Sequence, residues 1–391
     1  MRARIRRAIG QLTLPAAARE EQRRDAAGLA AEDPGTDRVL PALMHWLARA
    51  QDFSASNDGG VARDFSLIKG WASSYPETTG YIIPTMLEWA RRTGEPIWRE
   101  RALRMADWLV SIQFPEGGFQ GGKIDSTPVV PVTFNTGQIL LGLAAAEAET
   151  GRYREAMTRA ADWLTRTQDA DGCWRRHASP FADAADKQYD THVAWGLFEA
   201  ARLDASRGWG EAGLRNVRWA LAGQTANGFF PSCCLSNTEQ PLTHTLGYAL
   251  RGVIEAWRYR PADDLLAGAE RTADGLMSVL RPDGFLPGCL GPDWSAQADW
   301  ACLTGTAQIA HSWLLLSQIT GRSDYWDAAR RANAFVRRTV HLEGPADQRG
   351  GVKGSFPVDG HYGQWSYLSW ASKFAADSLV LELDLLVGAP G

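Results

Sequence analysis

The chain has 391 residues, of which 22% are charged, and its formal net charge is −4 at pH 7. This near balance gives no electrostatic reason to expect a nucleic-acid partner. No apolar run reaches the length of roughly 18 residues that a membrane span needs, so no transmembrane segment is expected. Five cysteines, an odd number, fit a reduced cytoplasmic protein better than a disulfide scaffold.

The first 36 residues differ from the rest of the chain. They begin with a basic segment, Met1–Arg7, and the apolar stretch that follows is too short and broken for a signal-peptide core. We therefore expect residues 1–36 to form a helical or disordered N-terminal extension. No Pro/Gly/Ser-rich hinge or charge block divides residues 37–391, which predicts a single domain.

A repeat of nearly sixty residues runs through that domain. Each copy has a bulky apolar pair at the end of a helix, followed by a turn that contains glycine. The pairs begin at residues 46, 108, 163, 219, 276 and 335, at steps of 62, 55, 56, 57 and 59. A period of this length accommodates two helices per repeat.

The two helices of a repeat differ in character. Residues 97–109 carry apolar side chains three and four positions apart with charges between them, which predicts an outer helix with one solvent face. Residues 136–147 are apolar nearly all round and predict a buried inner helix, and similar segments lie at 79–90, 191–201, 243–257, 304–319 and 366–386. Six such pairs predict an all-α (α/α)6 toroid. An open solenoid would need polar capping repeats, which the sequence lacks.

Parallel inner helices would gather their N-termini on one face, and the loops that enter them would enclose a pocket. Helix N-termini present free N–H groups and partial positive charge, which favour anions and oxygen-rich ligands. The candidate catalytic residues in these loops and helix starts are Glu77, Asp125, Asp190, His192, His244 and Asp299.

Two carboxylates can act as general acid and as base or nucleophile in glycoside hydrolysis. Glu77 and Asp190 are the favoured pair, because Tyr75 and Tyr189 could raise the pKa of one carboxyl by desolvation. The competing interpretation of Asp190 is a helix cap, and that of His192 and His244 is a buried core residue.

The same loops hold aromatic and polar residues that suit a sugar, since aromatic rings stack on pyranose faces and polar groups bind hydroxyls. The candidate substrate-binding residues are Arg63, Lys69, Trp71, Tyr75, Tyr189, Trp300, His361, Trp365 and Tyr367. We therefore predict a glycoside hydrolase that acts on a bacterial poly- or oligosaccharide. A uronate lyase or C5-epimerase, with a histidine base and cations that neutralise a carboxylate, is an alternative, as is an inactive sugar-binding toroid.

The segment Gln168–Trp174, preceded by Ala161–Leu164, resembles the QW motif of squalene-type terpene cyclases. The toroid of that superfamily is shared by protein prenyltransferase β subunits and by several glycoside hydrolases and polysaccharide lyases. The resemblance covers the architecture of residues 40–386. The chain has no Asp-x-Asp-Asp motif of the class II cyclases, so cyclisation is not expected.

Two further resemblances concern the site. In prenyltransferases Asp, Cys and His hold zinc, and Asp299, Cys302 and His361 occur here in similar order but with Asp-x-x-Cys spacing. This resemblance implies a zinc-dependent prenyl or terpenoid enzyme as a further alternative, whereas our main prediction has no metal or cofactor. The loop Trp71–Tyr81 resembles glycosidase- or lyase-like toroids of bacterial exopolysaccharide clusters, which favours a carbohydrate substrate.

Overall fold

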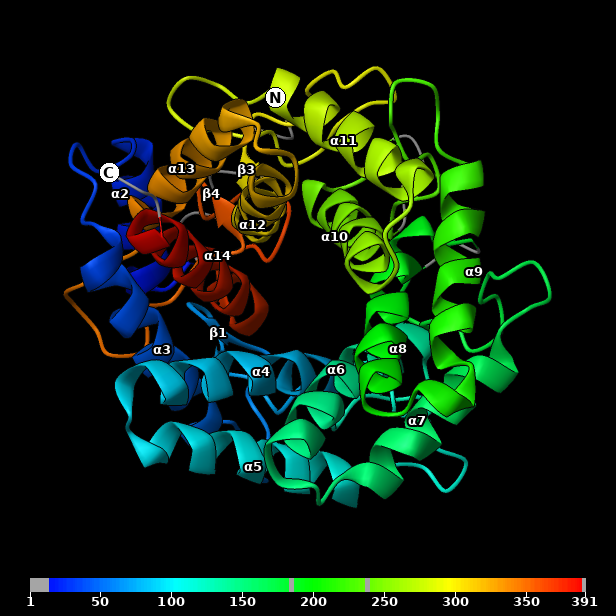
Figure 1. Cartoon of the computed structure of the whole chain (residues 1–391). Coiled ribbons are helices and arrows are strands. Elements are labelled where there is room, and N and C mark those ends of the chain that lie inside the picture. Colours follow the sequence, from blue (N-terminus) through cyan, green and yellow to red (C-terminus); the bar gives the residue numbers. More distant parts are fainter. Residues whose placement is uncertain (1–13, 183–185, 236–239, 389–391) are drawn as a thin grey trace, which may run out of the picture.

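The computed structural model describes residues 14–182, 186–235 and 240–388, and in them helices alternate between two concentric rings (Figure 1). The inner ring consists of α4 (Pro76–Thr93), α6 (Thr133–Thr150), α8 (Thr191–Leu203), α10 (Thr243–Tyr259), α12 (Leu303–Thr320) and α14 (Ser369–Gly388). The outer ring consists of α3 (Thr36–Asp52), α5 (Pro96–Ser111), α7 (Arg154–Thr167), α9 (Trp209–Ala222), α11 (Asp263–Ser278) and α13 (Ser323–Arg337).

The ring is closed between its last and first repeats. Each inner helix packs against the next, and α14 packs against both α4 and α3. Trp46 of α3 also donates its indole N–H to the backbone oxygen of Asp347, at 2.8 Å, in the loop of the last repeat. The predicted (α/α)6 toroid is therefore confirmed, including the closure inferred from the number of repeats.

A repeated glutamine connects four of the outer helices to the outer helix that follows. The side-chain amide of Gln168 donates to the backbone oxygens of Gly172 (3.1 Å), in its own turn, and of Ala212 (2.9 Å), on α9. Arg215 of α9 donates back to the Gln168 carbonyl oxygen at 2.8 Å. The equivalent bonds to the turn and to the next outer helix are made by Gln51, Gln113 and Gln224. The QW-like repeat thus has a structural role.

The turn glycines of four repeats lie closely against the backbone of the next outer helix: Gly117, Gly172, Gly228 and Gly284. Gly228 has φ +87°, and a Cβ there would lie 2.4 Å from the backbone carbon of Arg271. We expect Gly228→Ala to lower the free energy of unfolding by at least about 2 kcal/mol, since a left-handed conformation and a backbone clash both oppose alanine. Gly321→Ala is the control, because Gly321 has φ +74° with nothing within 4 Å. Thermal melts of the two variants should differ, and equal shifts would contradict the clash.

Short strands occur in the loops at the N-terminal ends of the inner helices. β1 (Asp64–Ser66) lies between β2 (Gly70–Trp71) and β5 (Ser366–Leu368), all antiparallel. A second pair joins β3 (Ala301–Cys302) to β4 (Ser355–Phe356). These pairings connect the loops of the first, fifth and sixth repeats, so they hold one face of the ring together.

Part of the expected extension is the helix α2 (Ala16–Ala26), which packs against the loop of the sixth repeat; residues 1–13 lie outside the described part of the chain. Lys353, 1% exposed, forms ion pairs with Glu21 and Asp25 of α2. Asp25 also accepts the backbone N–H of Val358 at 2.7 Å. All five cysteines are free thiols. Among the described helices, none is long and apolar enough to cross a membrane.

Candidate active site

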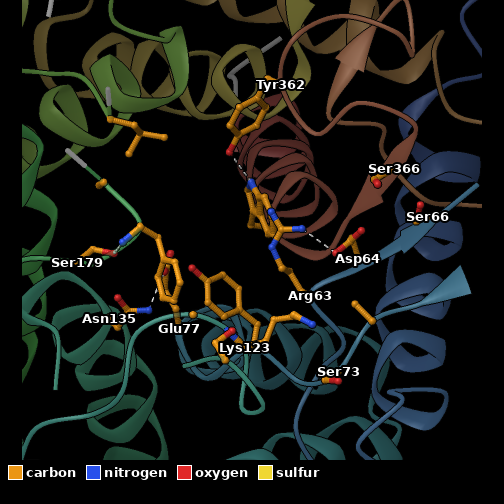
Figure 2. A pocket seen from close by; sticks show the side chains of 18 of the residues that line it. Arg63, Asp64, Ser66, Ser73, Glu77, Lys123, Asn135, Ser179, Tyr362 and Ser366 are labelled. Carbon is orange, nitrogen blue, oxygen red and sulfur yellow. Dashed lines mark hydrogen bonds and ion pairs between the residues drawn. The ribbon is translucent and has the colours of Figure 1, made fainter. Parts of the chain in front are cut away.

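A cavity of about 820 Å³ opens where the inner helices begin (Figure 2). Part of its wall is built from equivalent positions, since the second residues of four inner helices line it: Glu77, Phe134, His244 and Trp370. The loops of the first and sixth repeats supply much of the wall, including Arg63, Lys69, Trp71, Tyr75 and Tyr362. The cavity is therefore placed where the sequence predicts it, at the N-terminal ends of the inner helices.

Glu77 is the most perturbed carboxyl group on this wall. It lies in the first turn of α4, is 8% exposed, and accepts a hydrogen bond from the Asn135 amide at 3.0 Å. Burial raises its pKa to about 7, although a hydrogen bond from Tyr75 and the positive charge of Arg63 act in the opposite direction. A carboxyl group with this pKa can hold or release a proton near neutral pH, as a general acid or base requires.

Arg63 places a positive charge on the same wall, near enough to Glu77 to act on the pKa of that carboxyl group (Figure 2). It donates to Asp64 at 2.9 Å, and its guanidinium carbon lies 5.2 Å from the ring centre of Trp370. The Trp370 indole in turn donates to the Tyr362 hydroxyl at 2.8 Å. These contacts fix one face of the guanidinium while its remaining N–H groups can meet an anionic ligand.

His244 lies on the wall beside tyrosines. Its ring centre is 4.4 Å from that of Tyr248 and 5.3 Å from that of Tyr362, and its Nδ1 is 2.7 Å from the Gln308 side-chain oxygen. Burial lowers its pKa to about 4, with the Gln308 hydrogen bond opposing. The imidazole is therefore neutral at pH 7.

The structure brings seven of the fifteen predicted site residues to the cavity wall: Arg63, Lys69, Trp71, Tyr75, Glu77, Tyr189 and His244. The other eight are not on the described wall: Asp125, Asp190, His192, Asp299, Trp300, His361, Trp365 and Tyr367. The expectation that all six candidate catalytic residues line one cleft therefore holds for Glu77 and His244, and the other four lie elsewhere.

Asp190 and His192 are buried next to the wall rather than on it. Asp190 ends a short 3₁₀ turn before α8, two residues ahead of the position that Glu77 occupies in α4, so its side chain leaves the helix axis in another direction. Burial raises its pKa to about 7. His192 does occupy the position of Glu77, but its Nδ1 lies 2.6 Å from the Gln138 oxygen and the ring is fully buried.

The remaining six residues belong to the rim or to the loop core. Asp125 is exposed and accepts from Ser73 at 2.6 Å, just outside the wall. Trp300 is buried against the backbone of Gly288 and Gly360. Tyr367 is buried in β5, on the side of Glu21. Asp299 and His361 are exposed and Trp365 is half-buried, all in loops, and the His361 ring centre lies 6.1 Å from that of Trp300.

The proposed zinc ligands do not gather. Cys302 is fully buried, and burial raises the pKa of its thiol to about 12, which disfavours the thiolate that binds zinc. Asp299 and His361 are both exposed. Within residues 14–182, 186–235 and 240–388, no group of three or more His, Cys, Asp or Glu side chains is arranged to hold a metal ion.

Several wall residues were not among the predicted ones: Asp64, Phe134, Asn135, Tyr248, Tyr362, Gln364 and Trp370. Phe134 and Trp370 occupy the same position as Glu77, the second residue of an inner helix, but this alignment needs the helix starts that the structure gives. Tyr362 has no comparable signal, because its place depends on how the segment between β4 and β5 folds.

Comparison with known proteins agrees with this architecture. Residues 77–254 match the model of the squalene-hopene cyclase C-terminal domain. No curated protein matches the chain in sequence. An unsaturated glucuronyl hydrolase specific for heparin is similar in structure, with a TM-score of 0.71 and 14% identity, over 90% of this chain and 99% of that one.

Two further solved structures give the same result. The unsaturated glucuronyl hydrolase of Bacillus sp. GL1 matches with a TM-score of 0.69 and 14% identity, over 88% of this chain and 96% of that one. The cellobiose 2-epimerase of Spirochaeta thermophila DSM 6192 matches with a TM-score of 0.67 and 17% identity, over 96% and 99%. The fold is an (α/α)6 toroid. At these identities the toroid is what the likeness establishes, and the chemistry must be argued from the cavity.

Proposed function

We propose that the protein is a carbohydrate-active enzyme, a glycoside hydrolase that cleaves a bacterial poly- or oligosaccharide containing an acidic sugar. The observation that carries this proposal is Glu77, a buried carboxyl group with a pKa of about 7 on the wall of a cavity lined by aromatic side chains. Held protonated near neutral pH, it can donate a proton to the leaving oxygen of a glycosidic bond. The structural neighbours named as glucuronyl hydrolases support this choice.

Aromatic side chains support a sugar as the ligand. Around the proton donor the wall carries Trp71, Tyr75, Phe134, Tyr189, Tyr248, Tyr362 and Trp370. Such rings offer flat apolar surfaces to the C–H faces of pyranoses, while the tyrosine hydroxyls and indole N–H groups can bind sugar hydroxyls. Asp64 is the other carboxylate on the described wall and is therefore the candidate for activating water.

Charge on the wall supports an acidic sugar. Arg63, Lys69 and Lys123 line the cavity, against Asp64 and the partly protonated Glu77. A uronate carboxylate would be bound by charge-assisted hydrogen bonds from these cations. The same cations would neutralise a uronate for lyase or epimerase chemistry, so those reactions are tested beside hydrolysis.

One set of incubations separates these reactions. The protein is mixed with unsaturated glucuronyl disaccharides and, separately, with saturated uronate oligosaccharides. Hydrolysis releases reducing ends and, from the unsaturated substrates, removes the ultraviolet absorbance of the conjugated double bond. A lyase would instead create that absorbance, and an epimerase would incorporate solvent deuterium without cleavage. Binding by calorimetry with no product from any substrate would overturn the proposal in favour of a sugar-binding toroid.

We expect Arg63→Leu to lower kcat/KM for an acidic substrate about ten- to a hundredfold, because a hydrogen bond to a charged group contributes about 1.5–3 kcal/mol. With a carboxyl-reduced form of the same oligosaccharide as substrate, the same substitution should lower kcat/KM much less. Arg63→Lys keeps the charge and is the control for folding and for the loss of the stacked guanidinium. Equal losses on the acidic and the reduced substrates would show that Arg63 does not bind the carboxylate.

A further inference from the structure

The orientation of His244 is set by a partner on the next inner helix. His244 is the second residue of α10 and Gln308 is the sixth residue of α12. The imidazole Nδ1 lies 2.7 Å from the Gln308 side-chain oxygen, and both residues are buried, 6% and 4% exposed. A carbonyl oxygen only accepts hydrogen bonds, so this contact requires the hydrogen on Nδ1 and leaves Nε2 with a lone pair.

The side chain of His244 reaches the cavity, and its second ring nitrogen is Nε2. His244 lines the wall, and no hydrogen bond from the described residues reaches its Nε2. The corresponding atom of His192 is also without a partner in the described part of the chain, but His192 is fully buried and absent from the cavity wall, whereas His244 lines it. The imidazole of His244 therefore offers a hydrogen-bond acceptor to a ligand in the cavity.

The same arrangement occurs a second time without access to the cavity. His192, at the second position of α8, has its Nδ1 2.6 Å from the oxygen of Gln138, the sixth residue of α6. The two imidazoles flank Tyr248, with ring centres 4.5 Å (His192) and 4.4 Å (His244) away. The molecule thus contains a matched pair of which one member faces the cavity.

We propose that Gln308 is a positioning residue that holds His244 as the neutral Nδ1–H tautomer, so that Nε2 accepts a hydrogen bond from a hydroxyl of the substrate. The hydroxyl is that of a sugar, so this assignment rests on the proposed function. A lone pair at this point repels carboxylate and phosphate oxygens. The subsite at His244 therefore takes a neutral polyol part of the ligand, while an acidic group is directed to Arg63.

The surroundings keep the imidazole neutral. The groups that face it are Tyr248 of its own helix, Tyr362 of the sixth-repeat loop, Gln308 of α12 and Phe374 of α14. None of these is a carboxylate, and burial lowers the pKa of the imidazole to about 4. Over the neutral pH range the Nε2 atom of His244 can then accept a hydrogen bond but cannot donate one.

Nitrogen-15 NMR of the histidine-labelled full chain tests the tautomer without any substrate. The His244 signals are assigned by their loss in His244→Asn. We expect a protonated Nδ1 and an unprotonated Nε2 at pH 7. Gln308→Leu should remove this preference for His244 and leave His192 unchanged, and Gln138→Leu should do the reverse. A wild-type His244 protonated on Nε2 would overturn the proposal.

Gln308→Glu supplies a second readout. A carboxylate beside Nδ1 should stabilise the imidazolium and raise the pKa of His244 by at least about one unit. With the unsaturated glucuronyl disaccharide as probe, KM should then rise about tenfold while His244 is protonated and recover above its new pKa, with kcat changed much less. A histidine titration unmoved by Gln308→Glu would refute the positioning role. A tautomer found as expected, with no binding of any sugar, would instead refute the proposed function.

Discussion

Replacing Glu77 with glutamine should lower turnover at least about a hundredfold on a substrate that the wild type cleaves, because proton transfer by a positioned side chain contributes about 10²- to 10⁴-fold. The amide has nearly the same shape and can still pair with Asn135, which lies 3.0 Å from the carboxylate. Thermal stability should therefore stay close to that of the wild type. Turnover of the purified variant and its melting curve, measured on the same preparation, check both expectations.

The pH dependence of kcat/KM shows whether Glu77 acts as a general acid or as a general base. A general acid must be protonated, so with a pKa of about 7 the value of kcat/KM should fall as pH rises through about 7. A general base would show the opposite limb. In the glutamine variant the residual activity should lose this dependence on Glu77. If kcat/KM of the glutamine variant still fell with rising pH in the same way, a group other than Glu77 would be responsible for that decrease.

Asp190→Asn is the matched control. Asp190 is also a fully buried carboxyl group with a pKa raised to about 7, and it directly precedes the inner helix α8. It is absent from the described cavity wall, so its amide variant should keep most of the turnover. If Asp190→Asn lost as much activity as Glu77→Gln, the two residues would act together, as the sequence-based pairing of these carboxyls predicts.

The ring could be predicted from sequence because its signals are local and repeated. Each repeat carries its own amphipathic helix, apolar helix and glycine turn, and the Gln168 side chain bonds to a turn four residues away and to the next outer helix. The number of copies then implied closure. These signals can be read without knowing which distant residues are in contact. The approximate helix bounds and the division into inner and outer helices therefore followed from the periodicity.

The site was only partly predictable for a geometric reason. Near a helix start a shift of two residues turns a side chain by about 200°, which separates Asp190 from the wall position that Glu77 occupies. A sequence alignment without known helix starts cannot resolve that shift. His192 has the right position and the same glutamine contact as His244, yet it is fully buried and absent from the described cavity wall. Neither effect leaves a mark in the sequence near the residue itself.

The loop of the sixth repeat was harder still, because its path is set by a helix more than 300 residues earlier. The Val358 N–H donates to Asp25 of α2, and Gln22 of α2 donates to Asp359 at 2.8 Å. The segment held in this way carries Tyr362 to the cavity wall. A contact of this range has no local signal, so Tyr362 enters the site only through the tertiary structure.

The buried ion pairs of Lys353 with Glu21 and Asp25, which attach this loop to α2, should contribute strongly to the free energy of unfolding. Lys353→Met is expected to lower the free energy of unfolding by about 3–5 kcal/mol, since breaking a buried ion pair leaves an uncompensated charge. Lys353 is 1% exposed, and its partners Glu21 and Asp25 are 1% and 5% exposed. Chemical denaturation at pH 7 measures the loss. Replacing all three residues, as Lys353→Met, Glu21→Gln and Asp25→Asn, should restore much of the stability, because no buried charge then remains.

The pH dependence of the same variant separates charge from packing. His341 and Lys353 lower the pKa of Glu21 from 4.5 to about 2, against the effect of burial. In the wild type, the stability contributed by Glu21 is therefore complete above pH 4.5 and is lost as the pH falls towards 2. Without Lys353 the buried carboxyls are protonated more readily, so the deficit of Lys353→Met should shrink as the solution is acidified. A deficit that stays constant between neutral and acidic pH would mean that Lys353 stabilises the α2 contact through the packing of its methylene groups rather than through its charge.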